Sequence, residues 1–155
     1  MVVEVDGATA VCFSAPVVRT HLGEQGVAGA VGHLGPDLCE PDADLDAVLR
    51  RMATIPEPGT AVADVLLDQR VASGIGNVYK SEVLWACRLS PFTPIDAVDE
   101  DVRAELVATA ARQLRANLTT TRRTTVPGGL GVYGRARRPC RRCGTPIRVA
   151  RQSNQ

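Results

Sequence analysis

The stretch that decides the fold reads Leu67-Asp68-Gln69-Arg70-Val71-Ala72-Ser73-Gly74-Ile75-Gly76-Asn77-Val78-Tyr79-Lys80-Ser81-Glu82-Val83-Leu84. It predicts the end of one helix, a tight glycine turn and the start of a second helix. We expect Gly74 and Gly76 to adopt backbone angles closed to residues with a Cβ, and Asn77 to be the N-cap. Such a helix start suits a phosphate, because it presents unpaired N–H groups and the positive end of the helix dipole. An ordinary helical joint without a ligand has the same signature.

The composition bounds the class of protein. The chain has 155 residues, 45% hydrophobic and only 3% aromatic, which predicts an aliphatic core in one domain or two small ones. Neither a membrane-spanning run of about 18 apolar residues nor a secretory signal is visible, so we expect a cytoplasmic protein. Five irregularly spaced cysteines fit a reducing compartment better than a disulfide framework.

The net charge of +1 conceals a strong polarity along the chain. Residues 1–68 carry three basic and eleven acidic side chains, whereas residues 69–155 carry fifteen basic and six acidic ones. After Leu106 there are eleven arginines and no acid. A basic segment without compensating acids favours contact with a polyanion over a merely solvated surface, and nucleic acid is the expected partner.

The rest of the chain predicts a mainly α protein. Asp6-Gly7 between alternating apolar residues predicts a β-hairpin over Val2–Phe13, with another short strand around Val17–Val18. Gly23–Pro41 is interpreted as a connector. Four helices are expected, each beginning at a capping residue. The first runs from Asp44 (or Asp42) to Met52, the second begins at Thr60, the third begins at Asn77, and the long fourth runs from Asp99 to about Leu118. Thr119–Arg138 lacks periodicity and is expected to be mobile unless something binds it.

Several motifs together resemble one family. Leu67-Asp68-Gln69, Gly74-Ile75-Gly76-Asn77, Tyr79 and Glu82, with Pro91 following, are similar to the helix-two-turns-helix segment of the Fpg/Nei DNA glycosylases (formamidopyrimidine-DNA glycosylase and endonuclease VIII). Leu34-Gly35-Pro36-Asp37 before it and Val132-Tyr133-Gly134-Arg135 after it agree in order and spacing. The resemblance implies a remnant of an N-terminal β-sandwich and connector at 1–33, a helix-two-turns-helix DNA-binding domain at 34–125 and a partial zinc-finger region at 126–155.

The resemblance also implies how DNA is bound. The expected partner is double-stranded DNA, held by a monomer through backbone phosphates, which fix register without reading sequence. Asn77 is expected to contact a phosphate beside the lesion, in a turn that Gly74 and Gly76 shape. Lys80 either adds a phosphate contact or points to solvent. Arginines on the cysteine-containing side complete the expected interface: Arg135, Arg141 and Arg142, with Arg137 and Arg138.

Cys140-x-x-Cys143, followed by Gly144, has the form of a zinc knuckle, in which two thiolates on one tight turn reach one metal. In the family, a second cysteine pair further along completes a four-cysteine zinc site on a hairpin. The chain stops at Gln155 before such a pair occurs, so we expect an incomplete site that holds no zinc by itself.

The activity that the resemblance implies is base excision repair: removal of oxidised bases, then β-elimination at the abasic site by an N-terminal amine. The family has proline and glutamate where this chain has Val2 and Val3, so we expect the chain alone to be inactive. Val2 as the amine nucleophile with Glu4 nearby is an alternative, as is a non-catalytic module that contacts phosphates only. Asp68 and Glu82 are interpreted as structural carboxylates and Trp85 as a core anchor.

Overall fold

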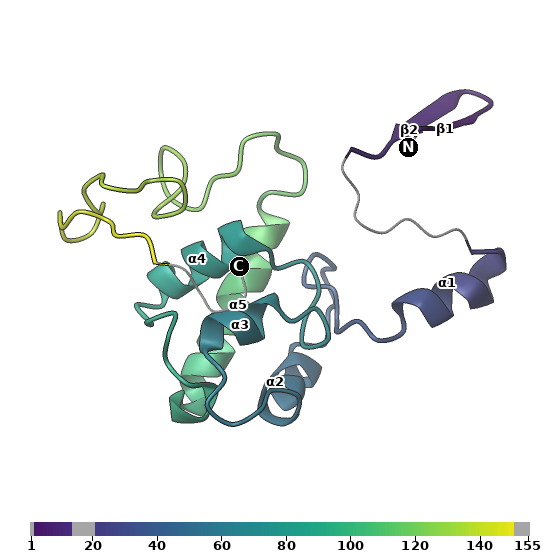
Figure 1. Cartoon of the computed structure of the whole chain (residues 1–155). Coiled ribbons are helices and arrows are strands. Elements are labelled where there is room, and N and C mark those ends of the chain that lie inside the picture. The colour runs from purple at the N-terminus through teal and green to yellow at the C-terminus, as the bar shows by residue number, and fades with distance from the viewer. Residues whose placement is uncertain (1, 14–20, 151–155) are drawn as a thin grey trace. The chain divides into compact units, whose positions relative to one another are not determined.

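A computed structural model describes residues 2–13 and 21–150 of the chain. These residues form two compact units, divided between His33 and Leu34. Within the described ranges the regular structure is mainly helical (Figure 1). No helix in those ranges has the length and apolar character needed to cross a membrane.

The first unit contains the predicted hairpin. Strands β1 (Val2–Val5) and β2 (Ala8–Val11) pair antiparallel, with Glu4 opposite Thr9, and Gly7 takes a φ of +82° in the turn. The connector prediction for Gly23–Pro41 is wrong in its first half, because helix α1 spans Gly23–Val31. Glycine weakens a helix by about 1 kcal/mol relative to alanine but does not forbid one. The strand expected around Val17–Val18 lies outside the described residues.

The second unit holds the hydrophobic core. Its elements are α2 (Leu45–Thr54), α3 (Val62–Leu67), α4 (Asn77–Ala86), the 3₁₀ helix η1 (Ile95–Ala97) and α5 (Glu100–Arg115). Helix α5 packs against α4 and α2, and the hydrophobic core of the unit is almost entirely Leu, Val, Ile and Ala, as the composition predicts. Tyr79 adds a ring to this aliphatic core.

The helix ends follow the predictions only in part. The Asp44 carboxylate caps α2 by accepting from the Ala47 N–H at 2.8 Å. Thr60 is not a cap, because its hydroxyl donates to the Glu57 carbonyl and Ala61 occupies the N-cap position of α3. Asp99 stands at the N-cap of α5 without a side-chain hydrogen bond. Helix α5 also ends before Leu118, which is 59% exposed rather than packed.

The Leu34-Gly35-Pro36-Asp37 segment is fixed against the turn that follows α3. The Gly35 N–H donates to the Gln69 carbonyl at 2.8 Å, and the Ser73 N–H donates to the Pro36 carbonyl at 2.9 Å. A Cβ on Gly35 would lie 2.4 Å from the Val71 carbonyl oxygen, so only glycine permits this backbone contact. The two motifs are therefore one structural unit that supports the start of α4.

Candidate nucleic-acid interface

The turn before α4 uses its two glycines differently. Gly74 has a φ of +100°, as predicted, and a Cβ there would meet Asp37 and Leu114 side-chain atoms at 3.4 Å. The Gln69 side chain ties this turn together by accepting from the Gly74 N–H and donating to the Ile75 carbonyl. For Gly76 the predicted unusual angles are wrong, because its φ is −113° and a Cβ would find no atom within 4 Å.

Asn77 begins α4 rather than capping it. Gly76 occupies the N-cap position, and no side chain caps this helix start. The predicted cap is wrong because the Asn77 side-chain oxygen is engaged elsewhere: it accepts from Lys80 Nζ at 3.0 Å. The start of α4 therefore keeps the expected character of an uncapped, positively polarised helix end.

Lys80 is a buried residue and does not extend into solvent. Its side chain is 8% exposed and its ammonium donates to Asn77 one turn earlier. Burial lowers the pKa of Lys80, and the nearby Asp64 carboxylate opposes that shift. The solvent-pointing alternative is therefore wrong.

Glu82 anchors the segment after α5 to the middle of α4. Its carboxylate is fully buried and accepts from the backbone N–H groups of Gly131 at 2.7 Å and of Val132 and Tyr133 at 2.8 Å each, and from the Thr125 hydroxyl. This confirms a structural role through backbone amides. The Asn117 side chain adds two bonds to the Thr124 backbone. Thr119–Arg138 lacks helices and strands, as predicted, yet it is fixed by these bonds.

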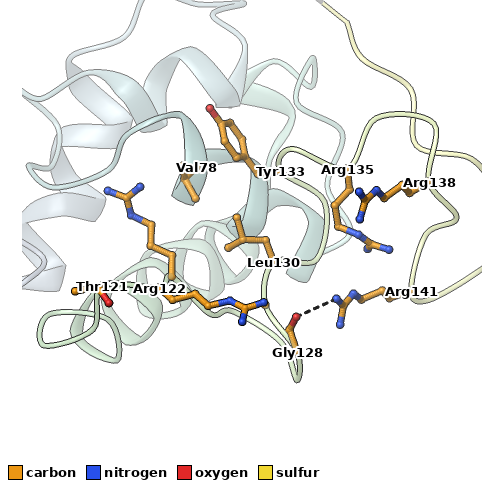
Figure 2. Close-up of a pocket in the computed structure, with 11 residues that line it drawn as sticks. Val78, Thr121, Arg122, Gly128, Leu130, Tyr133, Arg135, Arg138 and Arg141 are labelled. Carbon is orange, nitrogen blue, oxygen red and sulfur yellow. Dashed lines mark hydrogen bonds between the residues drawn. The ribbon is translucent and has the colours of Figure 1, made fainter.

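This anchored segment forms an arginine-lined pocket beside α4. Figure 2 shows its walls, with Val78, Leu130 and Tyr133 among the arginine side chains. The pocket has a volume of about 470 Å³, and the described residues that line it include no carboxylate. Its five arginines are Arg122, Arg123, Arg135, Arg138 and Arg141. Their concentrated positive charge gives the pocket the chemistry of a polyanion site.

The predicted arginines divide between this pocket and the protein's own backbone. Arg135 and Arg141 line the pocket while also donating to carbonyls, including those of Pro139 and Gly128. Arg142 does not line it. The Arg142 guanidinium instead lies 4.4 Å from the centre of the Trp85 ring and donates to the Trp85 and Ala86 carbonyls at the end of α4.

Arg122 and Arg123 are pocket residues that sequence reasoning did not single out. Burial raises the pKa of Tyr79, and Arg123, close to the Tyr79 hydroxyl, partly offsets that rise. The signal that could have identified both residues is the acid-free arginine run after Leu106, which contains them.

Cys140 and Cys143 lie on a tight hairpin that packs against Trp85. The Cys140 N–H donates to the Thr145 carbonyl and the Gly144 N–H to the Cys140 carbonyl, both at 2.9 Å. The Trp85 indole N–H donates to Cys140 Sγ, and together with backbone N–H groups it lowers the pKa of this thiol to about 6. Trp85 is thus half-buried beneath this hairpin, and its prediction as a core anchor is wrong.

The cysteine pair alone does not fit a structural zinc ion. Such an ion takes four protein ligands, usually sulfur or nitrogen. Across 2–13 and 21–150, no group of three or more His, Cys, Asp or Glu side chains is placed to hold a metal. The described part of the chain therefore supplies two thiol ligands and no complete site.

Val2 and Glu4, the alternative catalytic residues, lie on β1 of the first unit. Glu4 is exposed and pairs across the hairpin with Thr9. Val2 is 57% exposed and pairs with Val11. Neither residue belongs to the unit that contains the arginine pocket.

An uncapped helix start lies beside a guanidinium-lined pocket, and together they have the chemistry of a polyanion site. Comparison with known proteins identifies the family. The family model described as the formamidopyrimidine-DNA glycosylase H2TH domain matches residues 34–126. The chain belongs to this Fpg/Nei family.

Relatives agree with this assignment. A probable endonuclease 8 2 of Streptomyces coelicolor is 47% identical over 128 residues, covering 81% of this chain and 46% of that protein. The DNA-(apurinic or apyrimidinic site) lyase Nei2 of Mycolicibacterium smegmatis is 40% identical over 79% of this chain and 49% of its own length. The chain thus spans about half the length of these curated relatives.

Solved structures share the fold. MutM (Fpg) from Thermus thermophilus matches with a TM-score of 0.68 at 28% identity, over 84% of this chain and 53% of that one. Lactococcus lactis Fpg, in a complex with DNA containing an abasic site, matches with a TM-score of 0.71 at 20% identity, over 86% of this chain and 53% of that one.

Proposed function

We propose that residues 34–150 form the DNA-holding part of a base-excision-repair glycosylase and AP lyase, which grips duplex DNA by its backbone phosphates. The observation that carries this proposal is the pocket of five arginines without a carboxylate, which includes Val78 of the first turn of α4. Guanidinium groups bind phosphate oxygens through paired N–H donors, and an uncapped helix start adds backbone donors.

Asn77 has the central place in this proposal. It stands at the exposed first position of α4, directly before Val78 of the pocket wall. The space beside Gly76, where a Cβ would meet nothing, leaves room for a sugar–phosphate strand to approach the helix start. The relatives named as an endonuclease 8 and as an AP lyase, and the neighbour solved with abasic-site DNA, support this choice of ligand.

The whole protein is proposed to excise damaged bases and cleave the strand at the abasic site, in keeping with the glycosylase family to which the chain belongs and with the relative named as an AP lyase. The arginines, Asn77 and the backbone amides of the interface hold DNA rather than cleave it, because they donate hydrogen bonds and carry no nucleophilic amine. Borohydride trapping on an abasic-site duplex tests for a catalytic amine in the chain. A covalent adduct that is lost when Val2 is blocked would assign catalysis to the alternative nucleophile.

Fluorescence anisotropy with a labelled duplex containing an abasic-site analogue tests the binding proposal. We expect binding that weakens steeply with salt, since phosphate contacts release counterions. Asn77→Ala should lower the affinity about tenfold, which is the cost of about one phosphate hydrogen bond. Arg50→Ala on α2 is the matched control and should bind as wild type. Failure of the wild type to bind at low salt would refute the proposal.

A further inference from the structure

Lys80 and Asn77 form a pair whose geometry fixes the orientation of the asparagine amide. Lys80 Nζ lies 3.0 Å from Asn77 Oδ1. An ammonium carries three donors and no acceptor, so the amide atom facing it must be the oxygen. The Asn77 NH₂ group consequently points away from Lys80.

This orientation matters because a phosphate oxygen only accepts hydrogen bonds. A free asparagine amide can rotate to present either its donor or its acceptor to a ligand. We propose that Lys80 is a positioning residue, which holds the Asn77 oxygen so that only the NH₂ donors face a DNA phosphate. This inference rests on the proposed function and gives a role at the helix start to an ammonium group on a residue that is 8% exposed.

The rival role for Lys80 is a direct phosphate contact. A lysine that contacts phosphate directly contributes one counterion to the salt dependence of binding, about 0.9 in the slope of log K against log salt. A positioning lysine contributes to affinity only while Asn77 is present. The two roles therefore separate in a double-mutant cycle.

The cycle measures duplex affinity and its salt slope for wild type, Lys80→Met, Asn77→Ala and the double variant, with folding checked by circular dichroism. We expect Lys80→Met to lower affinity about five- to tenfold, with an unchanged slope and no further loss in the Asn77→Ala background. Lys80→Gln, which keeps an N–H donor without the charge, should restore most of the affinity, as should Lys80→Arg.

Three results would overturn the inference. The first is a folded Lys80→Met variant with wild-type affinity for the duplex. The second is a loss of affinity from Lys80→Met that persists in the Asn77→Ala background and comes with a shallower salt slope. The third is a folded Lys80→Gln variant that binds no better than Lys80→Met. Failure of the proposed function looks different, because the wild type would then not bind duplex DNA at low salt, or Asn77→Ala alone would bind as wild type.

Discussion

The buried Glu82 carboxylate accepts a hydrogen bond from the Gly131 N–H at 2.7 Å, joining the middle of α4 to a segment 49 residues later in the chain. The same carboxylate accepts from three further donors, and all of them belong to the segment that carries the arginine pocket. The Glu82 carboxylate therefore helps to fix the position of the pocket arginines relative to α4.

Glu82→Gln should lower the free energy of unfolding by about 2–4 kcal/mol, because an amide NH₂ group would face buried N–H donors. Urea denaturation measures this loss. Exposed Glu105 on α5 provides the matched control, and Glu105→Gln should change stability by less than about 0.5 kcal/mol. Equal stability of the two variants would show that the carboxylate does not hold the segment.

The two glycines of the turn should respond oppositely to alanine. Gly74→Ala forces a side chain into a φ of +100° and should cost about 1–3 kcal/mol of stability. Gly76→Ala should cost at most about 1 kcal/mol, from its N-cap position, yet weaken duplex binding because its methyl group fills the space for the strand. Thermal unfolding and anisotropy on both variants separate the effects. Normal DNA binding by Gly76→Ala would contradict the proposal that the space beside Gly76 admits the sugar–phosphate strand.

Arg142 should stabilise the protein rather than the DNA complex. Arg142→Ala removes the contact with the Trp85 ring and two bonds to the end of α4, and we expect faster hydrogen exchange at the Cys140 and Gly144 amides. The salt slope of DNA binding should stay unchanged. Exposed Arg148, which follows the hairpin, provides the control. A shallower slope in Arg142→Ala would instead place this guanidinium on a phosphate.

The Asp68–Arg70 pair should give stability a dependence on acid pH. The hydrogen bond from Arg70 holds the pKa of Asp68 below its ordinary value. A carboxylate with a depressed folded pKa contributes stability above its unfolded pKa and loses it as the pH falls through the folded pKa. Asp68→Asn should therefore be less stable than wild type at neutral pH and should approach it in acid. A constant difference at all pH values would contradict this ion pair.

The parts of the fold that could be predicted from sequence are those with local causes. The hairpin around Asp6-Gly7, the cap at Asp44 and the positive φ of Gly74 each follow from short-range sterics or hydrogen bonding. Helix α1 was missed because its glycines resemble a connector. The end of α5 was placed too late because the apolar pattern continues to Leu118 beyond the last helical residue.

The site was predictable in its chemistry but not in its pairings. Sequence motifs singled out Asn77 and the basic segment as candidates, yet the partners of Arg142 and Trp85 depend on long-range packing. Trp85 contacts a hairpin more than fifty residues away in the chain, and Arg142 caps the helix on which Trp85 lies. No local pattern distinguishes an arginine that faces a phosphate from one that caps a helix.

The salt dependence of duplex affinity tests the central claim most directly, comparing wild type with the Arg122→Ala/Arg123→Ala double variant. If the pocket holds phosphates, the slope of log K against log salt should be shallower in this variant than in wild type, by about 0.9 for each lost contact and so by up to about 2. Affinity should fall equally on duplexes of different sequence, since phosphates carry no sequence information. An unchanged slope and affinity in a folded double variant would contradict the account.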